Sequence, residues 1–153
     1  MSMYQYFGCG LDNVFLENGY KIVQTRHGDG VVIHDVAGLH VAIAVAVVSN
    51  PSPMIGKEFR FLRQELELSQ AALGALLGSN EQAVARWEKG KSKVDPLAER
   101  LLRLLYKETT VGNRNFDPVL KMLQQLESVP PQPKRFVAGE KKAKWGVEAR
   151  TAA

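Results

Sequence analysis

Residues 78–92, GSNEQAVARWEKGKS, combine apolar positions with side chains that can hydrogen-bond to the edges of nucleic-acid bases. Arginine binds guanine through O6 and N7, and glutamine binds adenine through N6 and N7, each pair giving about 1–3 kcal/mol of discrimination. Gln82 and Arg86 are one helical turn apart, so a helix would present both on one face. Val84 and Trp87 would then pack against a core. This division predicts a helix that lies in a DNA groove.

Two residues at the start of this helix have a second interpretation. Glu81 can accept a hydrogen bond from cytosine N4, or it can stabilise the positive N-terminal end of the helix. Ser79 and Gln82 are spaced as a capping box, in which the Gln82 side chain would turn back to the backbone. Asn80 is also a suitable N-cap. The sequence leaves both roles of Gln82 open, and we favour base contact.

Five amphipathic helices are expected around this segment. The residues SNPSP (49–53) interrupt regular structure, and helical periodicity begins after them. Asp-Pro pairs at 95–96 and 117–118 mark two further helix starts, because proline is favoured at the first helical position. The expected apolar stripes are Ile55, Phe59, Leu62 and Leu66; Leu73, Leu76 and Leu77; Val84 and Trp87; Leu97, Leu101, Leu104 and Leu105; and Val119, Met122, Leu123 and Leu126.

The second and third of these helices are short and closely spaced. Ser69 is a suitable N-cap for the second helix, and Gly78 ends it. Asn80 caps the third helix, which extends to about Lys89 and is stopped by Gly90. Two short helices joined by a tight glycine turn, with a longer helix on each side, form a helix-turn-helix. In this motif the second short helix enters the major groove.

Residues 62–106 resemble the Cro/cI-type, or Xre-family, helix-turn-helix. The family pattern has LSQ, LG and R-W-E-x-G at fixed spacing, and here these stand at 68–70, 77–78 and 86–90. Gly74 departs from the pattern, which usually has alanine; a small residue still allows close packing, at about 1 kcal/mol of helix propensity. The resemblance implies a sequence-specific DNA-binding transcriptional regulator.

The resemblance also implies roles for individual residues. Gln70 matches a glutamine that holds a DNA phosphate and braces the recognition helix. Arg63 and Glu88 match an ion pair that ties the first helix to the third, and we expect it to be structural because a half-buried charge needs its partner. The positions that meet base edges are Asn80, Glu81, Gln82 and Arg86, and those that contact the DNA backbone are Lys89, Lys91 and Lys93.

Residues 1–50 predict a small antiparallel sheet followed by one longer apolar element. Turn signals separate short β-prone runs. These runs are 13–16, 20–25 and 31–34. Asp35 is a suitable N-cap for the apolar run 36–48, whose length favours a buried helix over a buried strand. This run is shorter than the roughly 20 residues that cross a membrane.

The sequence therefore predicts an α+β protein in three parts. Residues 1–50 form a small α+β domain for dimerisation, sensing or partner binding, and residues 54–127 form an all-α, five-helix DNA-binding domain. Residues 128–153 are expected to be a flexible basic tail without regular structure, because few apolar groups are available there to offset the cost of ordering. Six Lys and Arg against two Glu in this tail account for the whole net charge of +4.

We expect no cofactor, no metal and no enzymatic activity. Cys9 is the only cysteine among 153 residues, which excludes an internal disulfide and makes a zinc site improbable. A metal or redox site of Cys9 with the three histidines is conceivable, but solvent or core positions are favoured. The histidines are His27, His34 and His40. No arrangement typical of catalysis stands out.

The order of an N-terminal block and a C-terminal Xre domain is also similar to that of MqsA-type antitoxins. Those proteins hold zinc with four cysteines in the N-terminal part, and this chain has only Cys9. Toxin binding is therefore not carried over by this resemblance.

We expect a repressor that binds double-stranded DNA at a palindromic operator as a homodimer, with recognition helices about 34 Å apart. An antitoxin that binds a toxin and autoregulates its operon is one alternative, and a metal- or redox-responsive sensor that acts through Cys9 and the histidines is a second. The sequence does not identify a small-molecule effector. We expect the protein in the cytoplasm, at the nucleoid, and not at a membrane.

Overall fold

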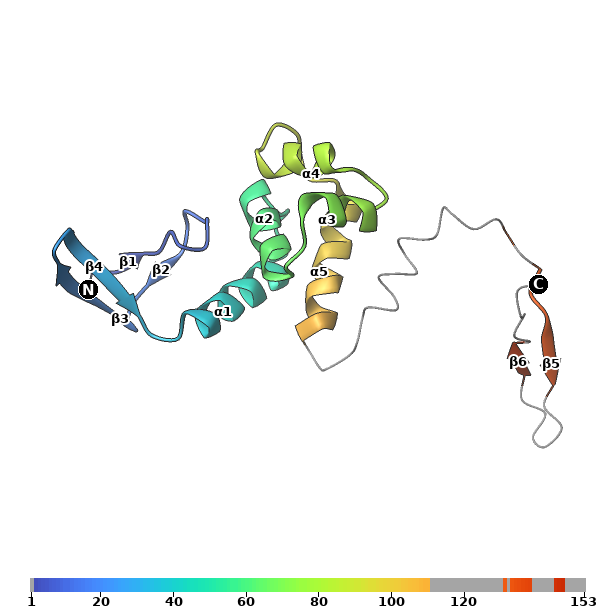
Figure 1. Ribbon diagram of the computed structural model, residues 1–153, viewed down its shortest axis with the longest axis horizontal. Helices are drawn as coiled ribbons and strands as arrows, with labels where there is room; N and C mark the ends of the chain where they lie inside the picture. Colours follow the sequence, from blue (N-terminus) through green and yellow to red (C-terminus); the bar gives the residue numbers. More distant parts are fainter. Residues whose placement is uncertain (1, 111–130, 132, 139–144, 148–153) are drawn as a thin grey trace.

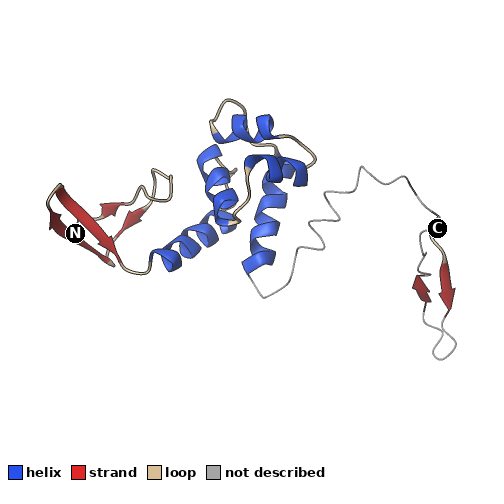
Figure 2. Cartoon of the chain, in the orientation of Figure 1, coloured by secondary structure: helices blue, strands red, loops and turns tan. Residues whose placement is uncertain are grey.

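The computed structural model describes residues 2–110, 131, 133–138 and 145–147, which form an α+β fold of antiparallel strand pairs and helices (Figures 1 and 2). The strands of the N-terminal part are β1 (Tyr4–Gln5), β2 (Phe15–Leu16), β3 (Tyr20–Thr25) and β4 (Gly28–Ile33). The helices are α1 (Val36–Ser49), α2 (Gly56–Glu65), α3 (Gln70–Leu76), α4 (Glu81–Glu88) and α5 (Pro96–Thr110). The predicted α+β class is confirmed.

The N-terminal strands form two separate two-stranded ribbons instead of one sheet. β1 pairs with β2, and β3 pairs with β4 in a register that runs from Tyr20 opposite Ile33 to Thr25 opposite Gly28. The strand β1 was not expected from the sequence, and β4 begins three residues before the predicted run at 31–34. A turn was expected at 27–30, but Gly28 and Gly30 belong to β4.

Local signals set the ends of the helices as expected. Asp35 caps α1 by accepting a hydrogen bond from the Gly38 backbone N–H at 3.1 Å, and this apolar run is confirmed as a helix. Ser69 caps α3 through the Ala72 N–H at 3.0 Å. After α3 and after α4 the chain turns at a glycine in the left-handed region, where a side chain would be strained. These are Gly78 (φ 66°) and Gly90 (φ 71°).

One hydrophobic core joins the N-terminal part to the helical part. α1 packs against α2 and α5, and α2 packs against α4 (Figure 1). The buried members are Tyr6, Cys9, Leu11, Ile43, Ala44, Val47, Val48, Met54, Phe59, Phe61, Leu62, Leu73, Val84, Ala98, Leu102 and Tyr106. The predicted linker at 49–53 thus connects two parts of one core, and the separate functional roles of 1–50 and 54–127 stay predictions.

The expected buried stripes are wrong in two places. Leu97 and Leu104 of α5 are 71% and 54% exposed, and Ile55 is 49% exposed at the N-cap of α2. The buried stripe of α5 is displaced by one residue, to Ala98, Leu102, Leu105 and Tyr106. Two neighbouring stripes of α5 are both apolar, so the period alone did not determine which one faces the core.

A further antiparallel pair occurs where no regular structure was expected. β5 (Phe136–Ala138) pairs with β6 (Trp145–Val147), with Phe136 opposite Val147. Both strands combine bulky apolar residues, which favour extended structure. The expectation for residues 128–153 is therefore wrong at these two segments. The predicted helix with Val119, Met122, Leu123 and Leu126 lies outside the described residues.

Within the described part of the chain, no helix is both long enough and apolar enough to cross a membrane.

Candidate nucleic-acid interface

The recognition helix α4 divides its residues between the core and the solvent as the sequence predicted. Val84 is fully buried, and the Trp87 ring meets the Phe59 ring edge to face at a centroid distance of 5.7 Å. Trp87 is only partly buried, less than we expected. The outer positions Glu81, Gln82, Arg86 and Lys89 are all exposed. A row of long polar side chains on a helix anchored from behind is what reading of base edges in a major groove requires.

Asn80, and not Ser79, is the N-cap of α4. The Asn80 side-chain oxygen accepts a hydrogen bond from the Ala83 backbone N–H at 2.8 Å. The capping box of Ser79 with Gln82 is therefore wrong, and within the described residues the Gln82 side chain makes no hydrogen bond. Gln82 is left to face a ligand, whereas the Asn80 side-chain oxygen already accepts the hydrogen bond of the helix cap.

A buried ion pair joins α2 to the end of α4. The Arg63 guanidinium donates from Nη2 to Glu88 Oε1 at 2.7 Å and from Nε to the same carboxylate at 3.0 and 3.2 Å. Its Nη1 donates to the Leu68 carbonyl at 2.9 Å, which holds the chain just before α3. The predicted Arg63–Glu88 pair is confirmed, and a pair with these added hydrogen bonds can remain buried.

Gln70 completes this network at the first residue of α3. Its side-chain NH₂ donates to Glu88 Oε2 at 3.1 Å, so one carboxylate receives hydrogen bonds from both α2 and α3. The bracing of α4 that we expected from Gln70 is visible. The phosphate contact expected of the same side chain stays a prediction.

Gly74 allows the turn between α3 and α4 to lie directly on α3. A Cβ at this position would be 2.6 Å from the Asn80 carbonyl carbon and 2.8 Å from the Asn80 oxygen. Real Cβ atoms do not approach backbone this closely, so even alanine would displace the N-terminus of α4. Glycine at this position thus allows the turn to lie against α3.

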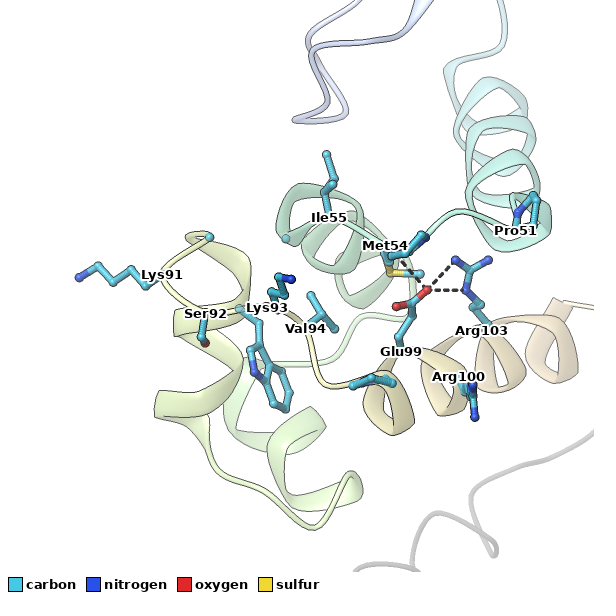
Figure 3. A pocket seen from close by; sticks show the side chains of 15 residues that line it. Pro51, Met54, Ile55, Lys91, Ser92, Lys93, Val94, Glu99, Arg100 and Arg103 are labelled. Atoms are coloured by element: carbon cyan, nitrogen blue, oxygen red, sulfur yellow. Dashed lines mark hydrogen bonds and ion pairs between the residues drawn. The ribbon is translucent and has the colours of Figure 1, made fainter.

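The loop after α4 carries the remaining predicted contacts. Lys91 and Lys93 are exposed, as is Lys89 at the C-cap of α4. Beside the loop is an open hollow of about 950 Å³ whose wall includes Trp87 and the Glu99–Arg103 ion pair, and the Lys91 side chain points away from it (Figure 3). The lysines are placed at the solvent edge next to α4, where they can meet a phosphate backbone.

Sequence reasoning missed Arg60 as a further cation near this surface. Arg60 is exposed on α2 and lines, with Lys89, a hollow of about 550 Å³ next to the loop of residues 7–10. The signal for it was its place on the polar face of the first predicted helix. Lys57 lies in the same hollow, but it pairs with Asp12 at 3.0 Å and lowers the pKa of that carboxyl.

Cys9 and the histidines are not brought together, and no group that could hold a metal ion occurs in the described part of the chain. Cys9 is buried. His40 instead bridges two other side chains, with Nε2 at 2.8 Å from the Tyr6 hydroxyl and Nδ1 at 2.9 Å from Glu65 Oε1. This chain of hydrogen bonds ties the N-terminal segment to α1 and α2.

Comparison with known proteins agrees with this geometry. The fold and the exposed recognition helix define a DNA-binding domain of a transcription regulator. Residues 59–105 match the family model of the helix-turn-helix, of the Cro/C1 type that is found in the Xre family. No curated protein and no solved structure matches the chain significantly. The assignment therefore applies to this segment.

Proposed function

We propose that the protein is a sequence-specific repressor, without enzymatic activity, that binds a palindromic DNA operator as a homodimer. The observation that carries the proposal is that α4 has one exposed polar side and one side fixed against the core. Gln82 and Arg86 are exposed and one turn apart, while Val84 is buried and Glu88 is fixed from behind by Arg63. The helix that carries these side chains is held in place before DNA arrives, which is what discrimination between base pairs needs.

The homodimer follows from the size of the reading surface. The first turns of one recognition helix reach only a few base pairs, and two copies related by a two-fold axis double the sequence that is read. The operator then consists of two inverted half-sites about one helical turn of DNA apart, and this repeat reflects the two-fold symmetry of the protein.

A protein-binding function as an antitoxin is the second candidate. The observation that favours it is the exposure of apolar side chains on the β3–β4 ribbon, where Ile22 is 64% and Val32 is 56% exposed. An adjacent open reading frame whose product is toxic, and which this protein neutralises, would support this candidate.

Selection of bound oligonucleotides from a random pool tests the main proposal directly. We expect a consensus with two inverted half-sites at a fixed spacing. Enrichment of no sequence above the starting pool would reject sequence-specific binding, and a single half-site would reject the dimeric operator.

A further inference from the structure

The helix α1 has an apolar face that the rest of the described chain leaves uncovered. One side of α1 packs against α2 and α5 through Ile43, Ala44, Val47 and Val48. On the opposite side Val41 and Val45 are 49% and 51% exposed. The neighbouring exposed residues on this side are Gly38, Ala42 and Ala46. We call the face made by Val41, Ala42, Val45 and Ala46 the outer face of α1.

The outer face is unusual for a surface helix because α1 has no charged side chain to place there. None of its 14 residues is Asp, Glu, Lys or Arg. Surface helices normally carry charged or polar residues away from the core, and a helix that is hydrophobic all round is buried on all sides. With 14 residues α1 is also shorter than the roughly 20 needed to cross a membrane.

The β3–β4 ribbon also has apolar side chains that the rest of the described chain leaves exposed. Within the described residues β3 and β4 pair only with each other, and every residue of β3 after Tyr20 is exposed. Ile22 and Val32 are apolar and more than half exposed, and they lie on opposite faces of the ribbon. A two-stranded ribbon is only marginally stable in water unless a further strand or a helix packs on it. The ribbon directly precedes α1 along the chain and lies beyond the N-terminal end of that helix (Figure 1).

We propose that a second copy of this chain covers the outer face of α1, with the β3–β4 ribbon completing the contact. This inference rests on the proposed homodimer and identifies the surface that forms it. In a two-fold dimer the same patch lies on both partners, so any charge in its centre would face the same charge. The outer face of α1 carries none, and its alanines beside Val41 and Val45 allow two helices to approach closely.

The alternative apolar surface, on α5, is less suited to its own copy. Leu97 and Leu104 are exposed there, but the exposed cation Arg100 lies between them. Two copies of Arg100 would be brought together at a two-fold axis, and like charges at an interface oppose association. The same leucines provide the matched control for an experiment.

Size explains why the ribbon must take part. A helix of 14 residues is about 21 Å long and about 10 Å wide, so the outer face spans only about 200 Å² in projection. A stable interface buries about 800 Å² on each partner. The ribbon, which directly precedes α1 along the chain, adds two strands of six residues each, with exposed apolar side chains.

Sedimentation velocity of the full chain without DNA tests the proposal. We expect the wild type to be a dimer. Val45→Glu should raise the dissociation constant of the dimer by at least about 100-fold, because an unpaired charge is then buried on each side. Leu104→Glu, at a position equally exposed on α5, should leave the dimer intact. Far-UV circular dichroism and thermal unfolding should show that the Val45→Glu chain remains folded, since glutamate is a good helix former.

A charge exchange makes the result independent of a failure to fold. Val45→Glu and Val45→Lys chains should each be monomeric and should associate when mixed, because opposite charges then meet across the two-fold axis. A wild type that is monomeric, or a dimer dissociated by Leu104→Glu and not by Val45→Glu, would overturn the inference.

Oligonucleotide selection separates this inference from the proposed function. A wild type that dimerises through Val45 but enriches no DNA sequence would leave the surface assignment standing and reject the operator. A wild type that enriches a sequence but sediments as a monomer would leave sequence-specific DNA binding standing and reject the surface assignment. The Val45→Glu chain should select the same half-site without the second copy of it.

Discussion

The Arg63 guanidinium and the Glu88 carboxylate lie 2.7 Å apart with 11% and 3% of their side chains exposed, and this pair fixes the recognition helix to the body of the protein. Because Gln70 binds the same carboxylate, the position of α4 relative to both α2 and α3 depends on one side chain. The network lies behind the exposed surface of α4, so it controls the orientation of that surface.

Glu88→Ala should lower the free energy of unfolding by about 3–5 kcal/mol, because it leaves the Arg63 charge buried without a partner. Urea denaturation monitored by circular dichroism would measure the loss. Asp12→Ala is the control, since it removes the ion pair with Lys57. The side chains of Asp12 and Lys57 are 60% and 55% exposed. Solvent screens such a pair, so the control should unfold nearly as the wild type does. Equal stability of the two variants would contradict a structural role of Glu88.

Gly74→Ala should destabilise the protein although alanine is the better helix former. The gain in helix propensity is about 1 kcal/mol. The new Cβ would meet the Asn80 backbone at 2.6 Å, and forcing atoms into a packed site costs about 1–3 kcal/mol. The midpoint of thermal unfolding should therefore fall.

The matched control for Gly74→Ala is Ala75→Gly, at the next, exposed position of α3. Its only expected effect is the loss of about 1 kcal/mol in helix propensity. An increase in thermal stability on Gly74→Ala would show that the turn between α3 and α4 can move away from α3 at little cost.

The parts of the fold that local signals determine could be predicted from the sequence. Asn80, Gly78 and Gly90 set the turn and the ends of the two short helices within a few residues of themselves. The burial of α5 could not be predicted in the same way, since Leu97 and Ala98 begin two adjacent apolar stripes and only the position of α1 and α2 decides between them.

Contacts between distant residues were also beyond the sequence. The Tyr6–His40–Glu65 chain joins three segments that are far apart along the chain, and nothing in the spacing of these residues indicates their meeting. Arg103 is a second case. The side chain was expected only to be on a helix, yet it binds the carbonyls that end α1 more than fifty residues earlier.

Arg103 should be irreplaceable by lysine because it uses both ends of its guanidinium. Nη1 donates to the Val48 and Asn50 carbonyls at 2.8 and 2.6 Å, and Nη2 donates to Ser52 O at 2.9 Å and to Glu99 Oε1 at 2.7 Å. A lysine cannot reproduce this fork. Each lost charged hydrogen bond contributes about 1.5–3 kcal/mol. We expect Arg103→Lys to lower the free energy of unfolding by at least that amount.

Amide hydrogen exchange would locate the effect of Arg103→Lys. Faster exchange at the C-terminal turn of α1 is expected, because Arg103 satisfies the carbonyls there. Arg100→Lys is the control, an exposed position on the same helix. If both lysine variants unfold like the wild type, Arg103 does not hold α1 in place.

Tyr6 should make stability fall at high pH. Burial, and after it the charges of Cys9 and Glu65, raise the pKa of Tyr6 above its ordinary value of 10.0. A raised pKa in the folded state contributes stability that is complete below the unfolded pKa and is lost as the pH rises through the folded pKa. Tyr6→Phe should remove this part of the decline, measured by urea unfolding at pH values of about 9 and about 11.

Tyr106 is the internal reference for the pH dependence, because burial raises its pKa as well and it is retained in the Tyr6→Phe variant. The variant should therefore show a smaller decline in stability, and not the absence of one. An unchanged difference between the two pH values would mean that the Tyr6 hydroxyl does not resist ionisation in the folded protein.

Arg86 and Lys91 should affect DNA binding in different ways, because Arg86 is exposed on α4 and Lys91 is exposed on the loop after α4. Arg86→Ala should cost about 1–3 kcal/mol on the selected site and relax the preference at one symmetric pair of positions. Lys91→Ala should weaken binding to selected and scrambled DNA by a similar factor, and the slope of log K against log salt should become shallower by about one. Fluorescence anisotropy titrations at several salt concentrations measure both the loss of affinity and the salt dependence.

Both side chains are exposed, so neither variant should change thermal unfolding. Equal losses on both DNAs for Arg86→Ala would show that Arg86 contacts phosphate and reads no base.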